Sequence, residues 1–272
     1  GIARDSMRIV GERINTSRKP INQAVAGRDA AAIQKEAAVQ IAGGADLIDV
    51  NAGSRRDSEV KDLLWLVEVI QGEFPEIRLS IDSPHPDSMH RVLDQVRLPP
   101  MLNSVTGEKA RFEAMCPVIQ SRPCDVVALC IDDRGIPKTA GQSVENAVQL
   151  VADLEGIGVD RERIYLDPVI QAVSTNTQAA VMALEAMDRI RKELDGVHII
   201  SGLSNISFGL PHRSLVNRTF LTLAMAAGLN AVILDSSDTK MMSALKATQL
   251  LLDQDPWCQS YTRAFREGNL TP

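Results

Sequence analysis

Carboxylate and carboxamide side chains recur along this chain, each at the end of a short apolar segment. They are Glu12 and Asn15, Asp49 and Asn51, Asp82, Asn103, Asp132, Asp167, Asn205 and Asp235. An Asp or Asn at any one of these positions is equally compatible with capping of the following helix. As a set, however, these side chains accept and donate hydrogen bonds and include no dedicated nucleophile. They therefore predict a site for a polar heterocycle with amide and amine edges.

The apolar segments alternate with stretches of helical periodicity. We predict strands at 8–14, 46–51, 78–83, 100–105, 125–132, 163–169, 197–204 and 231–236, and helices at 21–43, 58–73, 85–95, 108–121, 142–156, 176–194, 214–228 and 238–253. Strict alternation requires parallel pairing, and eight units match a (β/α)8 TIM barrel, an α/β fold with its chemistry at the carboxyl ends of the strands. The alternative, a doubly wound open sheet, usually begins with a glycine-rich turn, whereas this chain has Glu12-Arg13-Ile14-Asn15 there.

Composition and charge narrow the class of protein further. Aromatic residues make up only 3% of the 272 residues, as expected of parallel strands buried on both faces. No shift in composition divides the chain, so we expect one domain over 7–272 and a cloning remnant at 1–6. A net charge of −6 with scattered Lys and Arg argues against a nucleic-acid partner. Because no apolar run reaches the ~20 residues that cross a bilayer, we expect no membrane association and a cytoplasmic location.

The sequence predicts no metal bound by this chain. Its cysteines, Cys116, Cys124, Cys130 and Cys258, lack C-x-x-C spacing and a neighbouring histidine. We expect them to be reduced thiols, some of them buried. His85 and His90 are five residues apart at a helix start, where surface positions are more common than ligands.

Several motifs at the predicted strand ends occur together. They are GERIN (11–15), DVN (49–51), IDS (81–83), LNS (102–104), YLDP (165–168), GLSNISFGLP (202–211) and LVNRTFL (215–221). In this order they resemble the methyltetrahydrofolate:corrinoid protein methyltransferases, within the pterin-binding TIM-barrel superfamily. The resemblance spans nearly the whole chain from Met7 onward. It implies a homodimer and methyl transfer between the ring nitrogen of 5-methyltetrahydrofolate and a corrinoid, in either direction.

The resemblance also implies roles for individual residues. Asp82, Asn103 and Asp167 would bind the pterin ring, and Asn205 would lie near the nitrogen that carries the methyl group, in one loop with Gly202 and Ser204. Arg213, Glu12, Asp49, Asn51 and Phe208 are further candidates for substrate contact. Among these, Asp49 and Asn51 could instead hold the barrel mouth, and position 208 is polar in some relatives.

The leaving group explains why a donor is needed at that nitrogen. Cleavage of the methyl–nitrogen bond would expel an amide-like anion unless the nitrogen is protonated or hydrogen-bonded in the transition state. The amide of Asn205 can donate, and Asp167 can help to deliver a proton, directly or through water. We therefore expect these two residues to be catalytic.

The corrinoid is expected to arrive on a separate protein. The chain has no Asp-x-His-x-x-Gly motif of a cobalamin-binding domain, and no cysteine cluster for homocysteine activation. Two alternatives stay open. A dihydropteroate synthase would need an Asn-x-Thr-Pro-Asp-Ser-Phe loop after the first strand and a lysine after the seventh, and the chain has neither. A non-catalytic folate-binding subunit would not require a donor such as Asn205.

Overall fold

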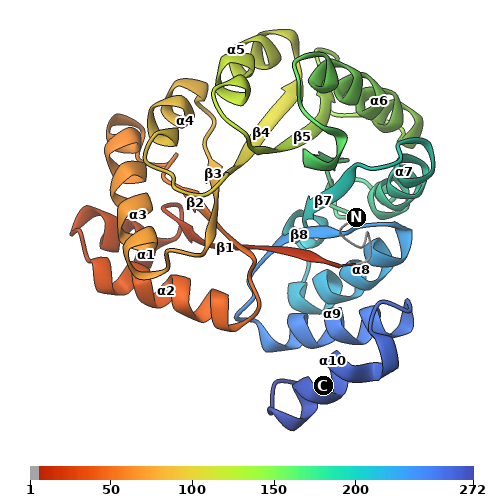
Figure 1. Cartoon of the computed structure of the whole chain (residues 1–272). Coiled ribbons are helices and arrows are strands. Elements are labelled where there is room, and N and C mark those ends of the chain that lie inside the picture. The colour runs from red at the N-terminus through yellow and green to blue at the C-terminus, as the bar shows by residue number, and fades with distance from the viewer. Residues whose placement is uncertain (1–5) are drawn as a thin grey trace.

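Eight parallel strands form a closed barrel in the computed structural model, which describes residues 6–272. The strands are β1 (Arg8–Asn15), β2 (Leu47–Asn51), β3 (Arg78–Asp82), β4 (Met101–Gly107), β5 (Asp125–Asp132), β6 (Ile164–Asp167), β7 (His198–Gly202) and β8 (Ala231–Leu234). Each strand pairs with the next along the chain, and β8 pairs with β1. The predicted (β/α)8 barrel is therefore confirmed (Figure 1). Of the expected remnant at 1–6, residues 1–5 lie outside the described residues.

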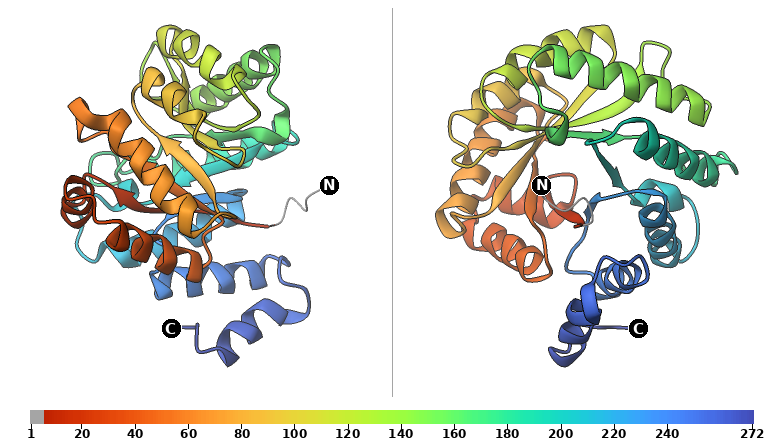
Figure 2. Two further views of the ribbon diagram at one scale, coloured as in Figure 1. Left: turned by 60° about the vertical axis from the view of Figure 1, so that its left-hand side comes forward. Right: turned by 45° about the vertical axis from the view of Figure 1, so that its right-hand side comes forward.

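Helices surround the barrel on its outer face (Figures 1 and 2). They are α1 (Lys19–Ala26), α2 (Ala30–Ala42), α3 (Glu59–Glu73), α4 (Pro86–Leu93), α5 (Lys109–Gln120), α6 (Ala140–Gly156), α7 (Ala179–Glu193), α8 (Arg213–Ala227), α9 (Thr239–Leu251) and α10 (Gln259–Arg266), with short 3-10 helices η1 (Arg56–Ser58), η2 (Arg161–Arg163), η3 (Ser204–Ser207) and η4 (Pro256–Cys258). In the part of the chain that the structure describes, no helix combines the length and apolarity needed to cross a membrane.

Two apolar cores stabilise this arrangement. The larger one lies between strands and helices, where aliphatic side chains from both are removed from water. The smaller one joins residues from most of the strands: Val10, Leu47, Met101, Val127, Tyr165, Ile200 and Ala231. Here the Tyr165 ring stacks on His198 with centroids 4.3 Å apart, and its hydroxyl accepts a hydrogen bond from Arg8 at 2.6 Å. These residues lie toward the amino ends of their strands, which leaves the carboxyl ends free to form a site.

The helix predicted at 21–43 is wrong as a single element. The structure has α1 and α2 instead, separated at Gly27–Asp29. Arg28 adopts a left-handed conformation with φ 52°, and the Asp29 carboxylate accepts a hydrogen bond from the Ala32 amide at 3.1 Å, which caps α2. A local turn and cap therefore override the continuous alanine-rich pattern. Helix α10, which packs on α9, was not predicted.

Three predicted strands end two residues earlier than expected, and one of them, predicted at 231–236, stops at Leu234. The strand predicted at 163–169 stops at Asp167, whose carboxylate accepts a hydrogen bond from the Val169 amide at 2.8 Å, and Val169 itself turns with φ 65°. The strand predicted at 197–204 stops at Gly202, and η3 begins at Ser204. Asn205 therefore lies on a short helical turn beyond the barrel rather than at a strand end.

Candidate active site

A cavity of about 340 Å3 opens at the carboxyl ends of the strands. Its lining comes from β1 and the loop after it, from β2, β3 and β4, and from β8 and the residue that follows it. These residues are Glu12, Arg13, Asn15, Ser17, Arg18, Asp49, Asp82, Asn103, Ile233 and Asp235. The barrel thus brings together Glu12, Asp49, Asp82 and Asn103, which are far apart in the sequence. Nearly all the lining groups are polar or charged, as a site for a polar ring requires.

Strand register places the acidic residues of this cavity beside one another. Asn51 lies opposite Asp82 across the β2–β3 ladder, and Asp82 lies opposite Asn103 across β3–β4. Asp49 lies opposite Ser80, whose hydroxyl donates to its carboxyl at 2.7 Å. The Asn103 amide also donates to Asp49, and the Asn51 amide donates to Asp82. Four of the predicted candidates, Asp49, Asn51, Asp82 and Asn103, therefore form one hydrogen-bonded cluster.

Asp49 and Asp82 differ in how strongly the cluster raises their pKa values. Asp49 is only 4% exposed, and burial raises its pKa well above the usual range, with the charge of Asp82 adding to the effect. Burial also raises the pKa of Asp82, but its hydrogen bonds from Asp49 and Asn51 oppose that rise. Two carboxyls this close favour one proton between them. Asp49 therefore holds a proton more readily than Asp82, and both residues line the cavity.

A second layer of polar groups supports Asp82 from the side of α3. The carboxylate of Glu59 is buried, accepts from the Ser83 hydroxyl at 2.9 Å, and lies 3.1 Å from the His85 ring nitrogen. Its charge raises the pKa of Asp82, while that of Arg111 lowers it. Arg111 donates to the main-chain oxygen of Ser104, which follows Asn103, at 2.7 Å. These contacts hold the ends of β3 and β4 together.

An ion-pair network forms the opposite rim of the cavity. Arg13 donates to Glu36 at 2.8 Å and to Asp235 at 2.9 Å. The side chain of Glu12, its neighbour on β1, makes no hydrogen bond within residues 6–272. Burial first, and then the charge of Asp235, raise the pKa of Glu12 to about 7, against the opposing charges of Arg18 and Arg13. Glu12 is thus a half-buried acid without a partner at the cavity wall.

Asp167 ends β6 and Asn205 lies on η3, and a hydrogen bond joins η3 to the segment that follows β6. Burial raises the pKa of Asp167 to about 6, and the hydrogen bond from the Val169 amide opposes this. The Asn205 side-chain amide donates to the main-chain oxygen of Ile170 at 2.6 Å. Neither residue lines the 340 Å3 cavity. The structure therefore places Asp167 at the end of β6 and Asn205 on η3, both outside the cluster around Asp82.

The remaining candidates lie on or beside η3. A Cβ atom at Gly202 would meet no atom within 4 Å, so this strand end borders open space. Ser204 lines a smaller cavity of about 80 Å3, together with Glu12. Arg213 donates to the Ser204 main-chain oxygen at 2.6 Å and to the Ser207 hydroxyl at 3.0 Å, and its guanidinium lies 5.9 Å from the Phe208 ring centroid. Arg213 thus holds the loop, and Phe208 is 59% exposed.

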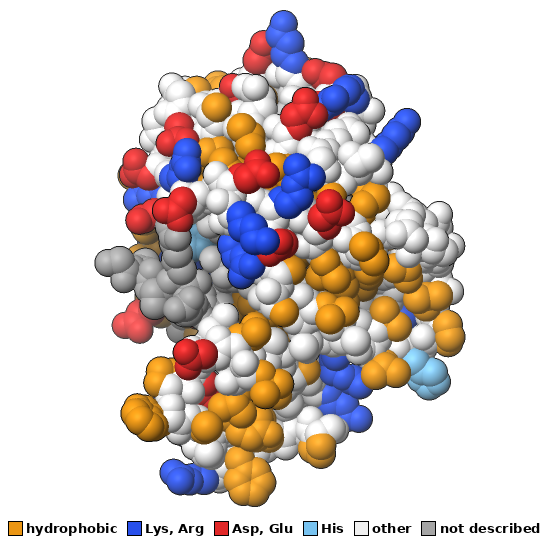
Figure 3. Space-filling view, turned by 90° about the vertical axis from the view of Figure 1, so that its right-hand side faces the viewer, with side chains coloured by type: hydrophobic (Ala, Val, Ile, Leu, Met, Phe, Trp, Pro, Cys, Tyr) orange, Lys and Arg blue, Asp and Glu red, His pale blue; other side chains and the backbone are white. Residues whose placement is uncertain are grey.

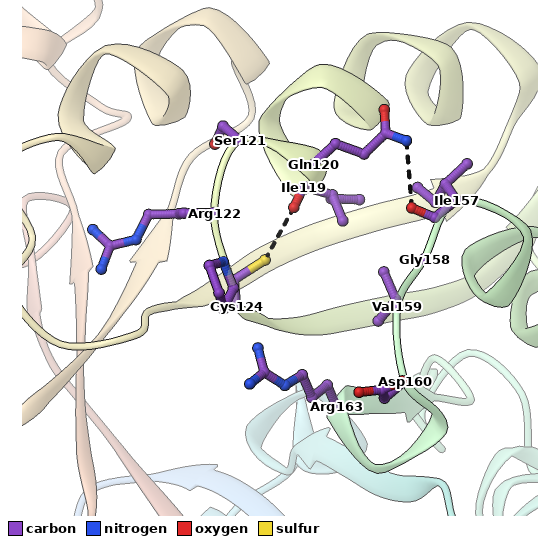
Figure 4. Close-up of a pocket in the computed structure, with 11 residues that line it drawn as sticks. Ile119, Gln120, Ser121, Arg122, Cys124, Ile157, Gly158, Val159, Asp160 and Arg163 are labelled. Carbon is purple, nitrogen blue, oxygen red and sulfur yellow. Dashed lines mark hydrogen bonds between the residues drawn. The ribbon is translucent and has the colours of Figure 1, made fainter.

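A larger cavity of about 650 Å3 lies at the other end of the barrel. It is bounded by the segments that lead into β5 and β6, including Gln120, Cys124 and Arg163 (Figure 4). None of the predicted site residues lines it. Within residues 6–272, no group of three or more His, Cys, Asp or Glu residues is arranged to hold a metal ion.

Comparison with known proteins identifies the family. Residues 11–235 match the pterin binding enzyme family. The chain is 35% identical over 268 residues to a methylcorrinoid:tetrahydrofolate methyltransferase of Eubacterium limosum, and the match covers 98% of each chain. This chain belongs to that family of pterin-binding methyltransferases. The recognition made from the strand-end motifs is therefore confirmed, and the chain is an enzyme.

More distant relatives share part of the sequence or the fold. The chain is 28% identical over 257 residues to methionine synthase of Mycobacterium tuberculosis, covering 90% of this chain but 22% of that longer protein. Dihydropteroate synthase of Vibrio fischeri superposes with a TM-score of 0.71 at 16% identity, covering 94% of this chain and 96% of that one. Dihydropteroate synthase of Xanthomonas albilineans superposes with a TM-score of 0.70 at 18% identity, covering 94% of this chain and 95% of that one. At such identities the synthases establish the fold alone.

Sequence reasoning missed several residues of this methyltransferase site. Ser80 lies inside β3, and nothing in the sequence indicates that it contacts Asp49, because only the register between β2 and β3 brings the two residues together. Asn15 and Asp235 were visible as polar strand ends, but they were not included among the site residues. Asn217 was present in the LVNRTFL motif, yet nothing in the sequence indicates that it borders the barrel mouth.

Proposed function

We propose that this enzyme transfers a methyl group between the ring nitrogen of 5-methyltetrahydrofolate and the cobalt of a corrinoid carried by a separate protein. The observation that carries the proposal is the hydrogen-bonded cluster of Asp49, Asp82 and Asn103 at a cavity in the barrel mouth. The Eubacterium limosum relative, named for methylcorrinoid and tetrahydrofolate, supports the same pair of substrates.

The pterin ring fits the chemistry of the cluster. Its cyclic guanidine-like edge presents two parallel N–H donors, which a carboxylate accepts as it would from arginine. Asp82 is the carboxylate in position, and the proton held by Asp49 fixes the orientation of Asp82 without adding a second charge. Asn103 offers donors and acceptors to the next part of the ring. Asp167 is assigned to the ring from the end of β6.

The reacting nitrogen is assigned to the side of η3. Asn205 uses one N–H on Ile170, and an amide nitrogen carries two, so the second is available to the nitrogen that gains negative character. Such a hydrogen bond strengthens in the transition state and lowers the barrier selectively. Asp167 lies at the end of β6 and supports proton delivery there.

The corrinoid is a second substrate, presented by its own protein at the open mouth of the barrel. Its cobalt supplies or accepts the methyl group, while the residues of this chain bind and orient the folate. Purified protein is therefore expected to show no corrinoid absorbance and no tight cobalamin binding. A stoichiometric bound cobalamin would contradict a separate carrier.

One assay separates this function from the two alternatives. The protein is mixed with 5-methyltetrahydrofolate and chemically reduced free cobalamin, and methylcobalamin formation is followed by its absorbance. A methyltransferase forms it, whereas a dihydropteroate synthase or a passive folate-binding subunit does not. The loop Ser204–Ser207 carries no lysine, which disfavours the synthase. Absence of methylcobalamin from folded, folate-binding protein would overturn the proposal.

A homodimer and a cytoplasmic location complete the proposal. Figure 3 shows hydrophobic side chains gathered across the face that carries α7 and α8, and over the C-terminal helices below. Val181 on α7, and Leu215 and Leu223 on α8, are among the exposed ones. Contiguous exposed apolar surface of this kind commonly forms a subunit interface. The free buried thiols of Cys124 and Cys130 suit a reducing compartment.

A further inference from the structure

A small cavity of about 80 Å3 lies beside the proposed folate site. It is bounded by η3, α8 and the residues around the end of β8, and its polar lining includes Ser204, Asn217, Asp235 and Asp238. Glu12, Ile233 and Asp235 line both this cavity and the 340 Å3 cavity. Glu12 therefore stands at the boundary between the two spaces.

One residue that lines the small cavity carries a polar atom without a partner. Asn217 Oδ1 is buried, and no group within residues 6–272 donates to it. A buried carbonyl oxygen without a hydrogen bond costs about 1–3 kcal/mol, so native structures usually satisfy it with protein or ordered water. The side-chain oxygen of Asn217 thus requires a donor that the described residues do not supply, and the cavity beside Asn217 is the nearest space in which a donor molecule could bind.

The neighbouring acids differ in how far they are already satisfied. Asp235 accepts from Arg13 at 2.9 Å and from the Ser237 hydroxyl at 2.6 Å. Asp238 accepts from the Met241 amide at 3.1 Å, which caps α9. Only the side chain of Glu12 has no hydrogen bond among the described residues. Glu12 and Asn217 are therefore the two groups with unused hydrogen-bonding capacity.

Water is the donor that suits this space. A cavity needs a volume of roughly 10–15 Å3 to hold one water molecule. The 80 Å3 of the small cavity therefore accommodates a short chain of water molecules. Water donates to Asn217 Oδ1 and both donates to and accepts from a carboxyl group. The absence of a three-ligand acidic or histidine cluster among the described residues disfavours a metal ion in the same place.

We propose that Glu12 and a water chain held by Asn217 form the proton-exchange site for the folate nitrogen. The inference rests on the proposed methyl transfer and extends it, because it names the group that gives or takes the proton. Glu12 is then a catalytic residue acting through water, and Asn217 is a positioning residue.

The charges around Glu12 suit both directions of proton transfer. Its pKa of about 7 results from burial and from Asp235, opposed by Arg18 and Arg13. Asp49 and Asp82 face it across the larger cavity, and Asp238 borders the smaller one. With a pKa near the working pH, both the acid and the carboxylate are populated, which is the optimum for general acid–base catalysis.

The proton balance is the same in either direction. When cobalt attacks the methyl carbon, the carbon–nitrogen bond breaks and its electron pair goes to the nitrogen. The proton lost by Glu12 then arrives there through water, and Glu12 regains a proton from solvent. In reverse, the nitrogen attacks the methyl carbon of methylcorrinoid, the carbon–cobalt bond breaks, cobalt keeps the electron pair, and the nitrogen proton passes to the Glu12 carboxylate.

The test compares Glu12→Gln with the wild type in single-turnover methyl transfer at saturating folate. The rate is measured from about pH 5.5 to about pH 8.5, a range of ~3 pH units that includes the pKa of Glu12. We expect the wild-type rate to change with an apparent pKa near that of Glu12. In Glu12→Gln, this dependence should disappear and the rate should fall about 100-fold or more, with folate affinity little changed. Glu108→Gln, the same change at an exposed site near the end of β4, should retain the wild-type profile.

Two further readouts make the outcome decisive. Asn217→Leu should slow transfer and raise the solvent isotope effect while leaving folate affinity intact, and a high-resolution crystal structure should show water within hydrogen-bond distance of Asn217 Oδ1. If Glu12→Gln stays active with the wild-type pH profile, or if the crystal structure shows no water in the cavity, this inference is overturned while the proposed function stands. A wild-type protein that binds folate but transfers no methyl group would overturn the proposed function as well.

Discussion

The side-chain amide of Asn205 donates a 2.6 Å hydrogen bond to the main-chain oxygen of Ile170. This contact ties the loop after β7 to the loop after β6. Two others reinforce it: the Val173 amide donates to Ile206 at 3.2 Å, and the Ser174 hydroxyl donates to the Phe208 oxygen at 2.6 Å. Asn205 can therefore act both as a structural link and as a donor to substrate, and the two roles can be separated.

Asn205→Ala should lower single-turnover methyl transfer by roughly 10- to 1,000-fold, because a donor that strengthens in the transition state is lost. Folate binding should suffer less. Ser174→Ala is the matched control, since it also removes a link between the two loops but leaves the amide in place. Circular dichroism verifies folding of both variants. Equal rates for Asn205→Ala and Ser174→Ala would show that Asn205 only links the two loops and does not act in catalysis.

Asp82→Ala and Asn103→Ala should each weaken binding of 5-methyltetrahydrofolate by about 1–3 kcal/mol, because polar groups of the ring lose their partners in a partly dry site. Calorimetric titration measures the affinity directly. Asp132→Ala provides the comparison: Asp132 also ends a strand, but it pairs with Arg134 at 2.8 Å and does not line the cavity. Unchanged affinity in both site variants would remove the pterin assignment.

The raised pKa of Asp167 predicts a pH-dependent stability difference. Its pKa is about 6 in the folded state against 3.8 for the ordinary group, so ionisation disfavours folding. The cost is absent below pH 3.8, grows between the two values, and is complete above pH 6. At pH 7.5, the free energy of unfolding of Asp167→Asn should therefore exceed that of wild type by about 1–3 kcal/mol, and the variant should unfold at a higher temperature. The difference should vanish at about pH 4, roughly 2 units below the pKa of Asp167 in the folded state. A constant difference across this range would show that Asp167 titrates normally.

The apolar face over α7 and α8 predicts a change in assembly. Leu223→Glu places a charge on α8 among exposed apolar side chains, where burial in a subunit interface would leave it unpaired and costly. Sedimentation analysis should find a dimer for wild type and a monomer for the variant. Lys61→Glu, at an exposed position of α3 on the opposite side of the barrel, serves as the charge-changing control. A monomeric wild-type protein at micromolar concentration would exclude this interface.

The local pattern of the sequence was sufficient for the fold class and for much of the site. Alternation of apolar segments and helical stretches allows only parallel pairing, and polar residues at strand ends must then meet at one end of the barrel. The pattern placed Asp49, Asp82 and Asn103 among these strand-end residues, and the resemblance to the methyltransferase family then singled them out as candidates for pterin binding. The alanine-rich segment 21–43 could not be divided correctly, because its break depends on the conformation of Arg28 and the cap at Asp29.

Tertiary structure alone decided how the site residues work together. Register sets Ser80 against Asp49 and leaves one proton between Asp49 and Asp82. Burial, which no single residue type reveals, raises the pKa values of Glu12 and Asp167. Closure of the barrel brings Asn217 of α8 to the same small cavity as Glu12 of β1. These properties arise from packing between distant segments, where desolvation and neighbouring charges act through space rather than along the chain.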